Sequence, residues 1–176
     1  MQTIRRLLAE NSGAEIAETA VVLPILFTIL LGIFFFGRAY NIHGTITQAA
    51  MQGARAAVAP LCATCAGGAL PADQIATNVI APVLQASHLN TAAVQPFTPT
   101  ACACGSVACG TPVACDPAGV SATPSICVQQ NVNLTATAGN QQCGTAVSFQ
   151  YPYGFNLPFQ SFTLQMKASA QMRAEN

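Results

Sequence analysis

The sequence predicts an α+β protein in which a long N-terminal transmembrane helix continues into an extracytoplasmic domain with a small antiparallel sheet. Three observations predict this architecture. An apolar run of 19 residues without a charge, 19–37, lies near the N-terminus. All eight cysteines follow that run, and residues 161–172 near the C-terminus alternate between apolar and polar side chains.

Composition and charge narrow the class of protein. The chain has 176 residues, of which 52% are hydrophobic, and its six basic and six acidic residues give a net charge of zero. A neutral chain has no basic surface with which to displace counterions from phosphates, so nucleic acid is excluded as a partner. The charged fraction is 7%, against roughly 25% in ordinary soluble domains, and this indicates a membrane or secreted protein.

The apolar run has the length of a membrane-spanning helix. As a helix it extends for about 28 Å, close to the roughly 30 Å hydrocarbon core of a bilayer. The alternative is a cleaved secretory signal, but its apolar part usually has only about 7–15 residues and ends at a small-x-small site. This run ends in FFFGRAY. We therefore expect a membrane helix that the mature protein retains.

The cysteines indicate the orientation of the chain in the membrane, which the basic residues do not determine. Arg5 and Arg6 before the apolar run are balanced by Arg38 and Arg55 after it. An even number of cysteines that can pair fully is typical of oxidising compartments, so we expect the C-terminal part outside the cytoplasm. The disulfide candidates, whose pairing stays open, are Cys62, Cys65, Cys102, Cys104, Cys109, Cys115, Cys127 and Cys143.

Two other chemistries could use some of these thiols. Cys102, Cys104, Cys109 and Cys115 could bind zinc, but disulfides are favoured because a small, loop-rich core gains most from shorter unfolded loops. Cys62 and Cys65 could form a redox pair. His43 and His88 are isolated, and no serine or cysteine motif accompanies either of them. We expect no catalytic residue, no metal and no cofactor.

Beyond the bilayer, the helix is predicted to continue to Pro60 with a narrow apolar seam. Small residues along it would let another backbone approach closely, either from a partner or from the protein's own domain. Pro24 and Gly32 in the apolar run are further candidates for helix packing. The seam comprises Ile42, Ile46, Ala49, Ala50, Gly53 and Ala57, spaced by three and four residues except between Ala49 and Ala50.

The remaining chain is predicted to contain one short helix and three strands. Residues 71–85 form the helix, which Pro82 bends or ends. Residues 96–125, rich in proline, glycine, cysteine and threonine, read as a loop. The strands are 126–137, 145–151 and 161–172, with 151–158 as a long hairpin loop. One face of their sheet is expected to pack on the proximal half of the long helix.

The junction SGAEIAETAVVLP carries the most informative motif. Glu18 lies five residues after Gly13, at the entrance of the apolar run, where a carboxylate is costly in lipid and needs a partner. Cleavage after Gly13 would create one, because the new amino group of Ala14 is positively charged. This arrangement resembles the class III signal of type IV pilin-like proteins, which a prepilin peptidase cuts on the cytoplasmic side.

The resemblance extends along the helix to the TadE-like family of tight-adherence (Tad) pilus assembly. That family combines a leader glycine, a glutamate, a helix with proline, an FGR turn and an AAxxGARAA segment. The tail TLQMKASAQMR is similar to its closing strand. The matching residues are Gly13, Glu18, Pro24, Gly32, Phe36, Gly37, Arg38, Ala49, Ala50, Gly53, Ala54, Arg55, Ala56 and Ala57.

This resemblance implies a pilin-like pseudopilin or minor pilin, held in the bacterial inner membrane with a cytoplasmic N-terminus and a periplasmic domain. Its implied partners are the prepilin peptidase, other pilins or pseudopilins, inner-membrane Tad assembly proteins and the lipid bilayer, and its implied process is cell adhesion. The expected parts are a leader (1–13), a transmembrane helix (14–40), its extracytoplasmic continuation (41–60) and a cysteine-rich domain (61–176).

Two other functions stay open on the sequence. One is a bitopic, disulfide-rich extracytoplasmic binding protein that does not polymerise. The other is a thiol oxidoreductase that uses Cys62 and Cys65. Neither function requires a carboxylate that enters the bilayer five residues after a leader glycine, so the junction favours the pilin interpretation.

Overall fold

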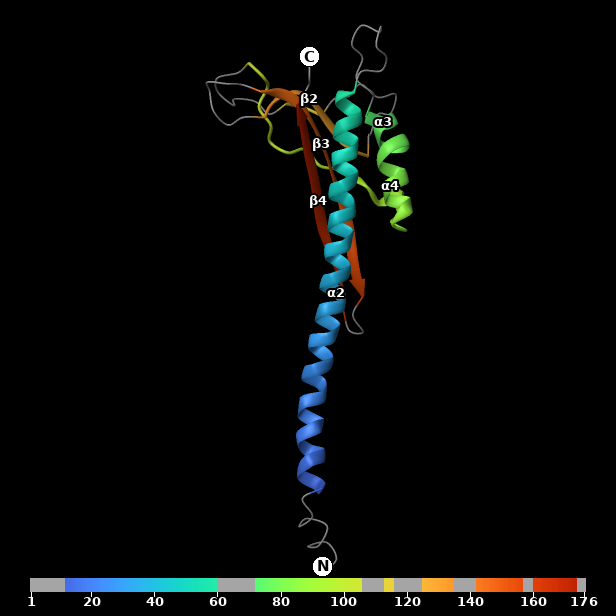
Figure 1. The fold of residues 1–176 in the computed structure, drawn as a ribbon, viewed down its shortest axis with the longest axis vertical. Coiled ribbons are helices and arrows are strands. Elements are labelled where there is room, and N and C mark those ends of the chain that lie inside the picture. Colours follow the sequence, from blue (N-terminus) through green and yellow to red (C-terminus); the bar gives the residue numbers. More distant parts are fainter. Residues whose placement is uncertain are drawn as a thin grey trace, which may run out of the picture. The chain divides into compact units, whose positions relative to one another are not determined.

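The computed structural model describes residues 12–59, 72–105, 113–115, 125–134, 142–156 and 160–173. The chain divides into two compact units, Met1–Tyr40 and Asn41–Asn176. A long apolar helix is followed by short helices and a small antiparallel sheet (Figure 1), which confirms the predicted α+β class.

Helix α2 spans Ser12–Val58 and runs through the boundary between the two units. Pro24 lies inside this helix without ending it, and the hydroxyl of Thr28 donates a hydrogen bond of 2.8 Å to the Pro24 carbonyl one turn earlier. The helix ends two residues before Pro60, in agreement with the preference of pre-proline residues for extended backbone.

The short helical segment of the second unit has three parts: α3 (Ala72–Ile75), the π-helix η1 (Ala76–Ile80) and α4 (Ala81–Ala86). Pro82 does not end the helix, which continues to Ala86. It occupies the first turn of α4, where a missing N–H is tolerated, and directly before it the Ala81 N–H bonds to the Ala76 carbonyl in the wider π pattern.

Helix α4 ends in a Schellman motif. The Leu89 N–H bonds to the Leu84 carbonyl and the His88 N–H to the Gln85 carbonyl, each at 2.9 Å. His88 takes the left-handed conformation, with φ of 56°, that this motif requires after the last helical residues. The isolated, exposed His88 therefore has a structural position at a helix end.

The sheet is built around β3 (Cys143–Asn156). Strand β4 (Ser161–Arg173) pairs with it antiparallel over its whole length, while β2 (Cys127–Asn133) and the short β1 (Gln95–Pro96) pair with its other edge. The strand predicted over 145–151 is thus longer at both ends, and the one predicted over 126–137 is seen between 127 and 133.

The prediction of a hairpin loop over 151–158 was wrong, because β3 continues to Asn156. Pro152 pairs with Gln165, and Tyr153 pairs with Leu164. The described partners on the other edge of β3 end at Gln150, so this part of the strand pairs on one side only. A proline is tolerated in a strand where its nitrogen faces an unpaired edge.

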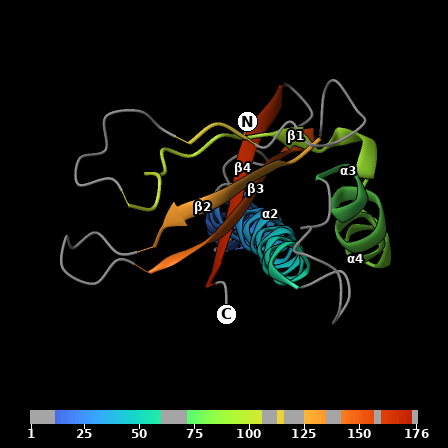
Figure 2. The same cartoon turned by 90° about the horizontal axis from the view of Figure 1, so that it is seen from above.

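Each face of the sheet has its own buried layer. Phe149, Tyr151, Met166, Ala168 and their neighbours lie on one face, and the Asn41–Val58 part of α2 packs along the sheet (Figures 1 and 2). The other face is covered by the cysteine-rich segment after β1, shown in yellow-green in Figure 2. The cluster on that side contains Ala101, Val132 and Ala146, with Val113 and Leu134 packed against them.

A bulge in β2 keeps both Gln129 and Val132 on the second face. Gln129 pairs with Ala146 and Val132 pairs with Gly144, so three residues of β2 correspond to two of β3. Asn131, with φ of 54°, absorbs the extra residue in the left-handed conformation. Beyond the bulge, Val132 also forms a bridge with Ala103 of the cysteine-rich segment.

Candidate functional site: the N-terminal apolar helix

The apolar side chains of the first unit cover the helix on every side. In the part of the chain that the structure describes, one helix is long and apolar enough to cross a membrane. Apart from the half-buried Phe35, its described large hydrophobic side chains up to Tyr40 are exposed, from 49% for Leu23 to 82% for Tyr40. A helix that is apolar all round is typical of a membrane span, since water would otherwise solvate this entire surface. The helix fits a single-pass membrane anchor.

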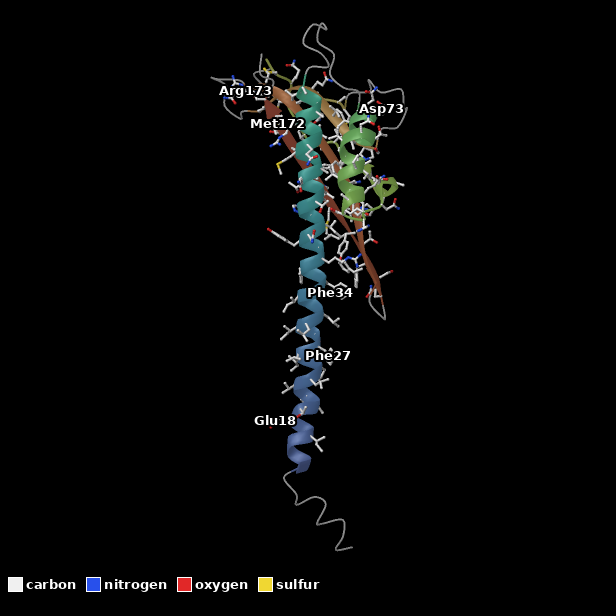
Figure 3. All side chains as sticks on the ribbon, turned by 45° about the vertical axis from the view of Figure 1, so that its right-hand side comes forward. Glu18, Phe27, Phe34, Asp73, Met172 and Arg173 are labelled. Carbon is white, nitrogen blue, oxygen red and sulfur yellow. A yellow bond between two sulfur atoms is a disulfide. The ribbon has the colours of Figure 1, made fainter. Side chains whose placement is uncertain are left out.

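The proposed processing site lies at the start of this helix. Gly13 and Ala14 belong to the first turn of α2, and residues 1–11 of the predicted leader (1–13) lie outside the described part of the chain. Glu18 is exposed on α2 (Figure 3). It lies four residues after Ala14, hence on the same face of the helix and about 6 Å further along the axis.

The residues predicted to pack helices together fall into two groups. Pro24 and Gly32 belong to the first unit, and apart from the adjacent residues and nearby backbone of the helix itself, no described atom lies within 4 Å of the position of a Cβ on Gly32. Ala50, Gly53 and Ala57 belong to the second unit and are buried there. Gly53 contacts Ile80 and Ile75 of the short helical segment, so part of the seam faces the protein's own domain.

The described cysteines are oxidised. Cys104 is bonded to Cys143 and Cys115 to Cys127, with Cα–Cα distances of 5.6 and 5.0 Å. Cys102 is also disulfide-bonded, and no cysteine within the described ranges is free. These residues contain no group of three or more histidine, cysteine or acidic side chains that could hold a metal ion. Cys62, Cys65 and Cys109 lie outside them.

One polar side chain that organises the cysteine-rich segment was missed in the sequence. Gln129 is completely buried in β2, and its Nε2 donates hydrogen bonds to the carbonyls of Pro99 at 3.1 Å and Val113 at 2.6 Å. The sequence pattern around a glutamine in a strand does not indicate whether its side chain is buried or what it binds. Only the distant carbonyls that the fold brings to it show its role.

The second unit also has a cleft of about 290 Å³ beside the π-helix. Its described lining is mostly apolar, with Ile80, Leu84, Val94 and Ile126, and its polar members are hydroxyl side chains without an ionisable group. The Thr77 hydroxyl in this lining is already bonded to the Asp73 carbonyl at 2.9 Å. The cleft offers apolar contact and no acid–base pair.

Comparison with known proteins finds a similarity over most of this helix. No curated protein and no solved structure matches the chain. Residues 13–55 match the family model described as TadE-like protein, a range that begins at Gly13 and ends at Arg55. This match agrees with the resemblance found in the sequence: residues 13–55 are similar to the TadE-like family.

Proposed function

We propose that this protein is a pseudopilin or minor pilin that takes part in assembly of a Tad-type pilus. The observation that carries the proposal is the helix itself. The TadE-like match covers the residues whose apolar side chains are exposed all round, together with Gly13 and Glu18 at its start. Such a surface needs a bilayer or neighbouring helices to cover it, and a pilin uses both in turn.

The proposed location is the bacterial inner membrane, with the N-terminus in the cytoplasm and the second unit in the periplasm. The disulfides of the second unit support this orientation, because such bonds persist in an oxidising compartment. On this orientation the peptide bond between Gly13 and Ala14 lies on the cytoplasmic side, where a prepilin peptidase acts.

In the proposed processing step, water hydrolyses the peptide bond between Gly13 and Ala14. The leader leaves with a new carboxylate on Gly13, and Ala14 receives a free amino group that is protonated at neutral pH. Co-expression with a prepilin peptidase should therefore give a mature chain that begins at Ala14 in N-terminal sequencing. An intact leader, or a cut at another position, would contradict the proposal.

Two variants make this test specific. Gly13→Val should block cleavage, because a branched side chain would stand where the substrate presents none. Gly37→Ala is the matched control in the same helix, since a Cβ there has no atom of the described chain within 4 Å. It should be processed like the unmodified chain. Equal processing of both variants would show that Gly13 is not the recognised residue.

Glu18 is proposed to pair with the amino group of Ala14 in a neighbouring subunit. In lipid the carboxylate needs a partner, and a pair that forms only between subunits would link processing to assembly. Glu18→Gln should be processed normally but reduce incorporation into the apparatus at least about tenfold, which needs only about 1.4 kcal/mol. Glu15→Gln is the control from the same turn. Unchanged incorporation of Glu18→Gln would remove the proposed role.

Pairing within one chain is the competing arrangement, because Ala14 and Glu18 share a helix face. A membrane-permeant carbodiimide distinguishes the two, since it joins a carboxylate to a nearby amine with loss of water. A pair between subunits gives covalent dimers that Glu18→Gln abolishes. A pair within the chain gives monomers lighter by one water, and this result would contradict the proposed intersubunit contact.

A further inference from the structure

The closed end of the β3–β4 hairpin carries an exposed apolar tip, which we define as Phe155, Phe162 and Leu164. Phe162 pairs with Phe155, and their ring centroids are 6.1 Å apart. Phe155 also contacts Tyr153 edge-on at 5.2 Å. Phe162 and Leu164 are 42% and 51% exposed, while Met166 and Ala168 on the same face of β4 are buried. On β4 this face is therefore buried along part of its length and exposed at the tip, while on β3 Tyr153 is buried and Phe155 is half-buried.

The tip differs in charge from the opposite end of the hairpin. From residue 117 to 166 the sequence has no charged residue and no histidine. Arg173 pairs with Gly144 at the open end, about 36 Å along β4 from Phe162. Figure 3 shows Asp73 and Arg173 at the same end of this unit. The second unit thus has one charged end and one uncharged, aromatic end.

The apolar tip points toward the end of the unit at which the chain enters it. Near that entry, the Thr45 and Ser87 hydroxyls are 3.5 Å apart, and the Tyr151 hydroxyl accepts a hydrogen bond of 3.1 Å from the Asn90 N–H. Tyr151 is therefore close to the level of Thr45, four residues after the first residue of the unit, Asn41. From Tyr151, β3 continues about 13 Å further to Phe155, away from Gly144.

We propose that the apolar tip inserts into the interfacial region of the same bilayer that holds α2, with lipid as its partner. Uncharged aromatic and aliphatic side chains are favoured at the headgroup boundary, and the charged end of the unit remains in water. The tip would act as a second, shallow membrane contact that limits rotation of the periplasmic unit about its helix. This inference rests on the proposed membrane anchoring of α2.

The chain contains no tryptophan, so single tryptophans report position without background. Three variants of the full-length protein are reconstituted in phosphatidylcholine vesicles. Phe27→Trp probes the apolar helix, Phe162→Trp the tip, and Gln171→Trp the exposed part of β4 near its charged end. Quenching is measured with lipids brominated near the headgroup, with lipids brominated near the bilayer centre, and with aqueous iodide. Leu164→Trp is a second reporter for the tip.

The expected result separates the three positions. The fluorescence of Phe27→Trp should be quenched most by lipids brominated near the bilayer centre. The fluorescence of Phe162→Trp should be quenched more by lipids brominated near the headgroup than by those brominated near the centre. The fluorescence of Gln171→Trp should be quenched by iodide alone. If Phe162→Trp and Leu164→Trp behave like Gln171→Trp, the tip lies in water and the inference is overturned. If both resist bromine and iodide, a protein copy covers the tip instead of lipid. If Phe27→Trp also escapes bromine, membrane anchoring itself fails.

Discussion

Gly53 of α2 lies directly against Ile80 of the π-helix. The Cδ1 of Ile80 is 3.1 Å from the position that a Cβ on Gly53 would occupy, and Cγ2 of Ile75 is 3.4 Å from it. Glycine normally weakens a helix, but here the absent side chain is what allows the short helical segment to approach α2. The contact makes the seam part of the protein's own core at this position.

The first prediction compares two glycines of α2. Gly44→Ala should raise the free energy of unfolding by about 1 kcal/mol, because alanine favours the helix and a Cβ there meets no described atom within 4 Å beyond the adjacent residues and nearby backbone of the helix. Gly53→Ala should lose most of that gain to the close contact with Ile80. Denaturant titration of the detergent-solubilised protein measures both changes. An equal gain at both positions would show that the contact with Ile80 imposes no constraint.

A second variant tests the same contact from the other side. Ile80→Val removes the methyl group nearest to Gly53, so Gly53→Ala should become more favourable in that background than in the unmodified chain. A double-mutant cycle isolates this coupling from the cost of the smaller core side chain. If the changes in unfolding free energy of the two substitutions simply add up, the predicted coupling between Gly53 and Ile80 is contradicted.

The end of α4 gives the next prediction. His88 adopts a left-handed conformation that glycine accepts without the Cβ penalty, so His88→Gly should stabilise the protein by about 0.5–1 kcal/mol. Gln85→Gly, three residues earlier on the exposed side of α4, should instead destabilise it by about 1 kcal/mol. Thermal unfolding followed by circular dichroism measures the opposite signs. Destabilisation by His88→Gly would indicate that the imidazole contributes contacts of its own.

Gln129 should be important for the layer that covers the second face of the sheet. Gln129→Leu leaves the carbonyls of Pro99 and Val113 without their buried donor, which should lower the free energy of unfolding by about 2–4 kcal/mol. Gln171→Leu, an exposed position on β4, is the control and should change it by less than about 0.5 kcal/mol. Similar effects of the two substitutions would remove the bridging role of Gln129.

The two disulfides for which the structure describes both cysteines are predicted to contribute unequally. The Cys104–Cys143 bond closes a sequence separation of 39 residues and the Cys115–Cys127 bond one of 12. On the loop-entropy account, serine substitution of the first pair should cost about 4 kcal/mol and of the second about 3 kcal/mol. Peptide mapping without reduction should first recover both linked pairs. Recovery of other pairings would contradict the described connectivity.

Gly32 tests whether the first unit packs against another helix. The chain itself has no described atom within 4 Å of a Cβ at this position, so Gly32→Ile should leave the folded monomer unchanged. If a neighbouring helix approaches there, the larger side chain should reduce incorporation into the assembly at least about tenfold. Leu31→Ile, an exposed position beside it, is the control. Normal incorporation of Gly32→Ile would show that this glycine faces lipid.

The sequence was most informative where one local pattern is sufficient. The charge-free run 19–37 predicted an apolar helix, and the structure has α2 with its large side chains exposed. Alternation over 161–172 predicted a strand, and β4 spans Ser161–Arg173 with Met166, Ala168 and Ala170 buried. Both elements can be predicted from the sequence, because each pattern follows from the geometry of a single helix or strand.

By itself, then, the sequence determined the apolar helix, its seam of small residues, the last strand and the resemblance of residues 13–55 to the TadE-like family. Only the tertiary structure decided that β3 continues through Pro152, that the bulge at Asn131 keeps Gln129 and Val132 on one face, and which cysteines pair as Cys104–Cys143 and Cys115–Cys127. A helix or an alternating strand is encoded by its own periodicity. A tolerated proline, a bulge and a disulfide depend on which distant segment lies alongside, and no local pattern in the chain records that neighbour.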